Sequence, residues 1–294
     1  MPAPSLSAIS SSDVYLKLEN LQHTGSFKVR GAFNSLISLS DEQRHNGVVT
    51  ASSGNHGLAV AFALGKLGIP GTIFLPENVA SVKYAKLQGY DVQIILIQGD
   101  GIAVETAAID YATRKGMSYI SPYNDARIIG GQGTIGVELH QQLEDIDCLF
   151  VSVGGGGMVS GTGGFLKEMN PGIRIIGCEP QHSRAMSESV KAGRIVEVEI
   201  LDTLSDGTAG GIEPESITFE PCSRLVDEWV SVSETEIAEG MRWVFEHHNH
   251  VIEGAAGVVV AAFLRRAEDL LVSHTALVIC GANIDEEKFN ALVN

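Results

Sequence analysis

The sequence predicts an α/β protein with two lobes, each a parallel-type sheet flanked by helices. Short apolar segments alternate with helix-like segments along all 294 residues. Strands that alternate with helices form parallel sheets covered on both faces. The 33 glycines and the aromatic content of only 6% fit such a fold, which is rich in small residues. A chain of this length buries a large core and tends to divide into two units.

The predicted strands are short and mostly β-branched or apolar, and they lie at 14–18, 47–50, 72–75, 92–96, 118–120, 148–153, 173–178, 228–232 and 276–280. The predicted helices show apolar residues at helical spacing, and they lie at 58–67, 79–88, 102–115, 133–143, 162–169, 234–248 and 255–267. Residues 201–224 are the least regular stretch, and long connections of this kind often line active sites.

Residues 47–124 contain a run of strand–helix units that can form a sheet of their own. We therefore expect a small inserted domain at 47–124 and a large domain built from 1–46 plus 125–294. Ligands bind at the carboxyl ends of parallel strands, so the cleft between the two sheets is the expected ligand site.

Charge and composition exclude several classes of function. The formal net charge of −16 argues against nucleic acid as a partner and against an anionic membrane surface. The apolar run at 255–264 is too short to span a bilayer. The four cysteines are far apart and form no C-x-x-C pair, which argues against a zinc ribbon or a disulfide framework and fits a cytoplasmic protein.

Lys28 opens an apolar run with helical spacing shortly after the Thr-Gly-Ser turn at 24–26. An amine at a helix N-terminus faces the positive end of the helix dipole, and Arg30 adds a second cation. Both favour the neutral, nucleophilic amine that a Schiff-base lysine requires. The alternative is an ordinary surface lysine.

Two loops follow predicted strands and precede predicted helices. Gly154, Gly155, Gly156 and Gly157 let backbone N–H groups converge on an anion at a helix N-terminus. The dinucleotide spacing G-x-G-x-x-G fails there in every register, although Glu179 stands where a ribose-binding acid would, and a tight turn without ligand stays an alternative. The loop at 52–57 (SSGNHG) combines hydroxyls, an amide and a helix N-terminus, which suits a carboxylate or a simple N-cap.

Three motifs occur together, at 25–31 (GSFKVRG), 52–57 and 154–158 (GGGGM). In this order and at these separations they resemble the serine/threonine dehydratases (ammonia-lyases) and serine racemases of the fold type II pyridoxal-phosphate enzymes, whose fold is like that of the tryptophan synthase β subunit. Residues 130–134 (GGQGT), 251–257 (VIEGAAG) and 280–283 (CGAN) extend the resemblance across nearly the whole chain. The combined pattern is specific to the family and less specific to one reaction within it.

The resemblance implies pyridoxal 5′-phosphate as the cofactor, held in the cleft by Phe27, Lys28, Asn55, Gly154, Gly155, Gly156, Gly157, Met158 and Cys280. Lys28 would form the Schiff base and later take the substrate's Cα proton, and the glycines with the Met158 N–H would hold the phosphate. Phe27 would lie against the ring, Asn55 would bond the 3-hydroxyl oxygen, and Cys280 would face the ring nitrogen. The substrate carboxylate would be surrounded by Ser52, Ser53, Asn55 and His56, with Ser53 as a second catalytic group on the ring face opposite Lys28.

Cys280 bears on the reaction, because a thiol cannot hold the ring nitrogen protonated as a carboxylate would. The ring is then a poor electron sink, which favours elimination of a β-hydroxyl from L-threonine or L-serine to give a 2-oxo acid and ammonia. Ser53 stands where racemases have their second acid, so a serine racemase with side dehydratase activity stays open, as do β-replacement and a binding protein without turnover.

Residues 204–213 and 217–219 resemble a bacterial subgroup that includes hydroxyectoine-pathway dehydratases. Arg127 would bind a second substrate carboxylate, as in hydroxyaspartate, or would make a surface ion pair. Relatives often bind a cation with residues that correspond to Glu179, Ser183 and Ala185. Since alanine replaces an aspartate at 185, the resemblance implies a monovalent or weakly held divalent ion, or none. It also implies a homodimer.

Overall fold

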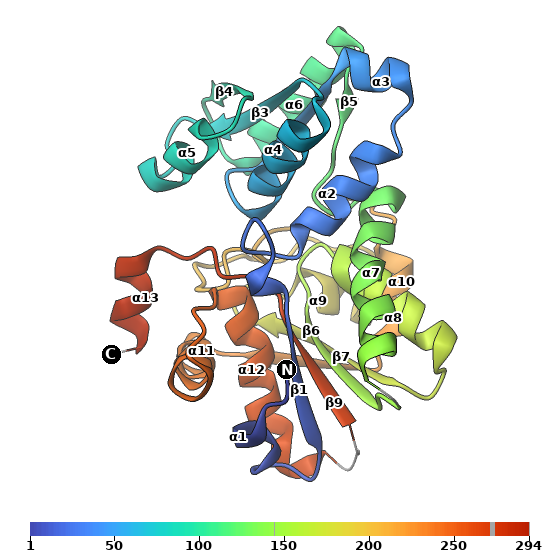
Figure 1. Cartoon of the computed structure of the whole chain (residues 1–294), viewed down its shortest axis with the longest axis vertical. Helices are drawn as coiled ribbons and strands as arrows, with labels where there is room; N and C mark the ends of the chain where they lie inside the picture. Colours follow the sequence, from blue (N-terminus) through green and yellow to red (C-terminus); the bar gives the residue numbers. More distant parts are fainter. Residues whose placement is uncertain (144, 271–273, 294) are drawn as a thin grey trace.

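The structure, a computed structural model, describes residues 1–143, 145–270 and 274–293. It contains two sheets, one in each lobe (Figure 1), in which every pair of described strands is parallel. The five-stranded sheet has the order β1-β9-β6-β7-β8 and the four-stranded sheet the order β4-β3-β2-β5. The α/β fold with two parallel sheets is therefore confirmed.

The strands are β1 (Asp13–Leu18), β2 (Val48–Ala51), β3 (Gly71–Pro76), β4 (Gln93–Ile97), β5 (Ser118–Tyr119), β6 (Cys148–Ser152), β7 (Arg174–Pro180), β8 (Glu228–Val232) and β9 (His274–Ile279). The helices are α1 (Pro4–Ser7), α2 (Lys28–Ile37), α3 (Asp41–Asn46), α4 (Asn55–Leu67), α5 (Ser81–Gln88), α6 (Gly101–Lys115), α7 (Ala126–Gln142), α8 (Gly157–Met169), α9 (Ala185–Ala192), α10 (Phe219–Leu225), α11 (Glu234–His248), α12 (Gly254–Arg266) and α13 (Glu286–Val293), with short 3-10 helices at Glu19–Leu21 and Ala267–Asp269.

The large sheet is covered on both faces, as its continuous apolar strands require. Helix α12 packs across β6, β7, β8 and β9, and Phe263 of α12 meets Phe150 of β6 with ring centroids 5.6 Å apart. Helices α7 and α8 lie on the other side of the sheet in Figure 1, and α11 covers α12. This arrangement buries β6 along its entire length.

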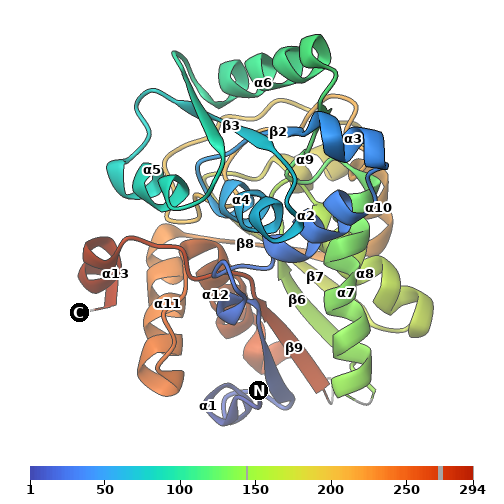
Figure 2. The same ribbon diagram turned by 45° about the horizontal axis from the view of Figure 1, so that its top comes forward.

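The small sheet also lies between helices, with α6 on one face and α4 on the other (Figure 2). Helix α6 covers a buried cluster that includes Val49 and Phe74, whereas α4 covers one that includes Ile73 and Leu75. Because successive side chains of a strand point to opposite faces, the alternation in β3 places Ile73 and Phe74 in different clusters. Both layers hold the carboxyl end of β2, which carries the loop at 52–57, toward the large lobe.

Helix α2 connects the lobes. Its apolar residues Val29 and Leu36 belong to the same buried cluster as Ala59 and Leu64 of α4, and α2 also packs against α7 of the large lobe. The domain division at 46/47 stays a prediction, and we note that the apolar face of α2 is shared with the small-lobe core.

Several boundaries differ from the predicted ones. Helices α4, α7 and α8 begin at Asn55, Ala126 and Gly157, before the predicted starts at 58, 133 and 162. Glycines and polar residues interrupt the apolar spacing near these starts; in α7 the positions three and four after Ile128 are Gly131 and Gln132. The side chain of Asp125 caps α7 by accepting from the Arg127 N–H at 2.6 Å. Helix α10 interrupts the stretch predicted as irregular. None of the helices in the described part of the chain is long and apolar enough to cross a membrane.

Candidate active site

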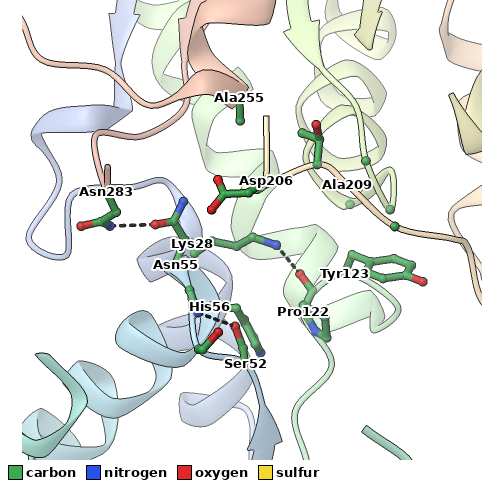
Figure 3. A pocket seen from close by; sticks show the side chains of 18 of the residues that line it. Lys28, Ser52, Asn55, His56, Pro122, Tyr123, Asp206, Ala209, Ala255 and Asn283 are labelled. Carbon is green, nitrogen blue, oxygen red and sulfur yellow. Dashed lines mark hydrogen bonds between the residues drawn. The ribbon is translucent and has the colours of Figure 1, made fainter. Parts of the chain in front are cut away.

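A cavity of about 570 Å³ lies between the two lobes. It is lined by the loops that follow β2, β6 and β9, so the carboxyl ends of strands from both sheets meet there (Figure 3). Twelve of the residues predicted for cofactor or substrate line it: Phe27, Lys28, Ser52, Ser53, Asn55, His56, Gly154, Gly155, Gly156, Gly157, Met158 and Cys280.

Lys28 is the first residue of α2, and its position is fixed from the end of β9. The Phe27 N–H donates to the Cys280 carbonyl at 3.0 Å and the Ala282 N–H donates to the Gly25 carbonyl at 2.8 Å. Gly25 has φ +71, and a Cβ there would lie 3.1 Å from the Asn283 side chain, so the turn requires glycine. These contacts place the lysine beside Cys280 in the cavity.

The Lys28 amine donates to the Pro122 carbonyl at 2.8 Å (Figure 3). Burial lowers its pKa from 10.5 to about 8, while nearby Cys280 and Glu253 act in the opposite direction. The expected contribution of Arg30 was wrong, because the Arg30 guanidinium forms ion pairs with Glu19 and Glu138, each at 2.7 Å. Burial, rather than a second cation, favours the neutral amine.

A pH dependence of cofactor uptake follows from this shift. Only the neutral amine can attack an aldehyde, and the neutral fraction increases as the pH rises toward about 8. The rate at which apo-protein takes up pyridoxal phosphate should therefore rise about tenfold per pH unit below that value and level off above it. Stopped-flow absorbance across a pH series measures it; a rate that keeps rising up to pH ~10 would indicate an unperturbed lysine.

The glycine loop after β6 is enclosed by neighbouring side chains. A Cβ at Gly155 would lie 2.4 Å from the Tyr123 ring, and one at Gly156, where φ is +81, would lie 2.6 Å from the Cys222 sulfur. Helix α8 begins at Gly157, and the first N–H groups of a helix have no intrahelical acceptor. The loop is thus a backbone cradle at a helix N-terminus, which suits a phosphate.

Asn55 is held from both sides by residues to which the sequence analysis gave no role. Its Nδ2 donates to the two carboxylate oxygens of Glu253 at 2.8 and 3.0 Å. Its Oδ1 accepts from Asn283 Nδ2 at 2.7 Å (Figure 3). Glu253 and Asn283 belong to the quoted motifs at 251–257 and 280–283, so the signal was present. Together they fix the orientation of the Asn55 amide.

Glu253 is buried, which raises its pKa to about 7, although the hydrogen bond from Asn55 acts against the shift. The Cys280 sulfur lies 3.9 Å from Glu253 Oε1 and 3.6 Å from Ser152 Oγ. Burial also raises the pKa of the Cys280 thiol, so this group is neutral at physiological pH.

His56 is a neutral group in this site. Its Nε2 lies 3.1 Å from the Ile120 carbonyl, so this nitrogen carries the single N–H of the neutral ring and donates it to that carbonyl. Burial, together with the charge of Lys28, lowers the pKa of His56 to about 3. An imidazole in this state carries no positive charge. The carboxylate-binding capacity of the 52–57 loop therefore comes from hydroxyls and backbone N–H groups at the start of α4.

Arg127 is not among the residues that line the cavity, and its role at a second substrate carboxylate stays a prediction. Its Nε and Nη2 atoms donate to the Asp125 carboxylate at 3.3 and 3.1 Å, outside the cavity lining. Asp125 is the residue that caps α7, so the guanidinium stays with the helix start.

The predicted cation ligands Glu179 and Ser183 are not among the residues that line the cavity, although Ser183 contacts Gly210, which is. Glu179 Oε1 accepts from the Ser187 N–H at 3.2 Å, Ser183 Oγ accepts from the Gly210 N–H at 3.2 Å, and burial raises the pKa of Glu179 to about 7. No group of three or more His, Cys, Asp or Glu side chains suited to a metal ion occurs among the described residues. A cation held by Glu179 and Ser183 stays a prediction.

The sequence profile described as "pyridoxal-phosphate dependent enzyme" matches residues 1–281. The chain belongs to this family. It is 40% identical over 289 residues to the L-threonine ammonia-lyase of Thermotoga maritima, covering 98% of this chain and 72% of that protein. Among solved structures it is similar to threonine deaminase isoform 2 of Solanum lycopersicum (TM-score 0.94, 32% identity, 99% of this chain and 81% of that one) and to maize serine racemase (TM-score 0.93, 32% identity, 99% and 89%).

The residues in the cavity fit the cofactor of this family. A buried lysine amine with a lowered pKa matches the aldehyde of pyridoxal phosphate, and the glycine cradle, which excludes any Cβ, matches its phosphate. The two features come from different loops and line one cavity, so a single small molecule can contact both.

Proposed function

We propose that this chain is a pyridoxal-phosphate-dependent ammonia-lyase that converts L-threonine, L-serine or both into a 2-oxo acid and ammonia by α,β-elimination. What supports the proposal most is one combination: a lysine with a pKa of about 8 shares a cavity with a glycine cradle, in a chain 40% identical to an L-threonine ammonia-lyase. The substrate is a small amino acid.

Bound pyridoxal phosphate supplies an electron-accepting ring that makes the Cα–H of the substrate acidic. Lys28 Nζ, in its neutral form, accepts that proton. Gly154 to Gly157 would hold the phosphate through backbone N–H groups. Phe27 lies at the cavity wall beside Lys28, with the amine 5.3 Å from its ring centroid. Glu253 and Asn283 hold the Asn55 amide in place for the ring's 3-oxygen.

The loop at 52–57 binds the substrate carboxylate through the start of α4, and Ser52 and Ser53 add hydroxyl donors. Cys280 remains a neutral thiol and offers no negative charge to the ring nitrogen. The Cα electrons would then leave most readily by expelling the β-hydroxyl, which departs as water with one added proton. The unsaturated amino acid that remains would tautomerise to an imine, and water would hydrolyse the imine to the 2-oxo acid and ammonia.

A substrate panel tests the reaction. We expect stoichiometric ammonia and 2-oxobutyrate from L-threonine, or ammonia and pyruvate from L-serine, with little D-serine formed. A coupled dehydrogenase assay and chiral chromatography measure the products. D-serine as the main product would replace the lyase by a racemase, the second candidate, which Ser53 at the cavity and the similarity to maize serine racemase favour.

The panel should include L-threo-3-hydroxyaspartate, because a hydroxyaspartate or hydroxyectoine-pathway dehydratase is the other alternative. With Arg127 outside the cavity, the cationic side chains left for a second carboxylate among the described lining residues are Lys83 and Lys86. We also propose a cytoplasmic homodimer and a monovalent or weakly held divalent cation at Glu179 and Ser183. Size-exclusion chromatography tests the homodimer, and the effect of K⁺ on turnover tests the cation.

A further inference from the structure

Residues 206–218 form a segment that runs along one side of the cavity. Its first part, from Asp206 to Gly211, belongs to the cavity lining (Figure 3). Just before it, Thr203 Oγ1 and the Leu204 N–H donate to the Glu234 carboxylate at 2.7 and 2.6 Å. The segment is thus hydrogen-bonded to α11 just before its first residue. Its position over the cavity then depends on the contacts of residues 213–218 at its other end.

Tyr123 forms a wall of the glycine cradle. Its ring atoms lie 2.4 to 2.6 Å from the site of a Cβ at Gly155, and its Cβ lies 3.1 Å from the site of a Cβ at Gly157. The residue before it, Pro122, carries the carbonyl that accepts from Lys28. Tyr123 is therefore next to both ends of the proposed cofactor, and a change in its position changes the cradle.

Glu213 joins Tyr123 to the segment at 206–218. Its backbone N–H donates to Tyr123 Oη at 3.2 Å, and its Oε2 accepts from Asn124 Nδ2 at 2.7 Å. Asn124 Oδ1 in turn accepts from the Ile217 N–H at 2.9 Å. Thr218 Oγ1 donates to the Gly155 carbonyl at 2.6 Å, so the same segment also reaches the cradle directly.

We propose that the Glu213 side chain is a positioning group: through Asn124 it keeps residues 206–218 over the cavity, and this in turn keeps the Glu213 backbone N–H in place to hold Tyr123 against the cradle. Glu213 itself is not part of the cavity lining, and it acts through Tyr123 and Asn124. The inference rests on the proposed binding of pyridoxal phosphate at this cradle. Its consequence is that Glu213 sets the affinity for the phosphate end of the cofactor.

Three variants test the role of Glu213, with cofactor affinity of the apo-protein measured by equilibrium dialysis. Glu213→Ala removes the acceptor for Asn124 and should weaken pyridoxal phosphate binding about tenfold. Glu213→Gln keeps an amide oxygen that can accept from Asn124, so most of the affinity should return. Glu215→Ala removes an exposed carboxylate of the same segment and should leave the affinity unchanged.

Pyridoxal, which lacks the phosphate, separates positioning from general damage. In Glu213→Ala the preference for pyridoxal phosphate over pyridoxal should fall about tenfold, together with the affinity. Equal weakening of both compounds, or a lower melting temperature with an unchanged preference, would overturn the role of Glu213. Inorganic phosphate should compete with pyridoxal phosphate in the wild-type apo-protein; absence of competition would instead reject the cradle itself and with it the proposed cofactor placement.

Discussion

Lys28→Ala is expected to reduce ammonia release by at least about 10³-fold, because it removes both the nucleophile for the cofactor aldehyde and the group that takes the Cα proton. The variant should also lose the near-visible absorbance of lysine-bound cofactor. Alanine is a good helix former at the first position of α2, so we expect the fold to persist. An absorbance spectrum and an ammonia assay on the same sample measure the two effects together.

Lys83→Ala is the matched control for this prediction. Lys83 also lines the cavity, but its side chain is exposed and pairs with Asp206 at 3.1 Å. The control should keep the absorbance band, since the Lys83 amine is exposed and held in an ion pair with Asp206. If Lys28→Ala kept the band and Lys83→Ala lost it, the cofactor-binding lysine would be on α5 and the site would need a new assignment.

The fold could be predicted because its signals are local. Alternating strands and helices with continuous apolar strands such as residues 148–152 indicate a doubly covered parallel sheet, and the order of the motifs indicates the loops that meet at its edge. The residues at which the helices start were harder to predict from the sequence. At Ala126 the helix begins with a side-chain cap from Asp125, whereas at Gly157 it begins in a glycine loop without a side-chain cap, and regular apolar spacing marks neither start.

The sequence predicts the site residues that lie together in one loop, but not the contacts between loops that are distant in the sequence. Lys28 and the glycines of the cradle each lie within one motif, although residues from other parts of the chain fix their positions. The partners of Asn55 do not lie in its motif, since Glu253 is 198 residues and Asn283 is 228 residues away in the sequence. For Arg127 the sequence left two roles open, a second substrate carboxylate or a surface ion pair, and the structure shows the ion pair, with Asp125 two residues away.

Cys280→Asp is expected to destabilise the apo-protein by about 3 kcal/mol near neutral pH, because it introduces a second carboxyl beside a buried one. The Cys280 sulfur lies 3.9 Å from Glu253 Oε1, and both residues are buried. Two carboxylates at this separation cannot both ionise, so folding raises their pKa values above the ordinary range. The native state then binds more protons than the unfolded state. The loss in free energy of unfolding, relative to the wild type, therefore grows as the pH rises from about 4 toward neutral.

The same variant should slow elimination, since a carboxyl near the ring nitrogen favours protonation of the ring and a longer-lived carbanion over expulsion of the hydroxyl. Cys280→Ser is the control that removes the thiol without adding a charge. A hydroxyl is neutral and of similar size, so the free energy of unfolding should stay within about 1 kcal/mol of the wild type and turnover should persist. Urea unfolding of the apo-proteins at pH 5 and pH 7.5 and initial rates of ammonia release measure both. Faster ammonia release in Cys280→Asp than in Cys280→Ser would contradict the role given to the neutral thiol, whereas equal stability of the two at pH 7.5 would mean that the new carboxyl turns away from Glu253.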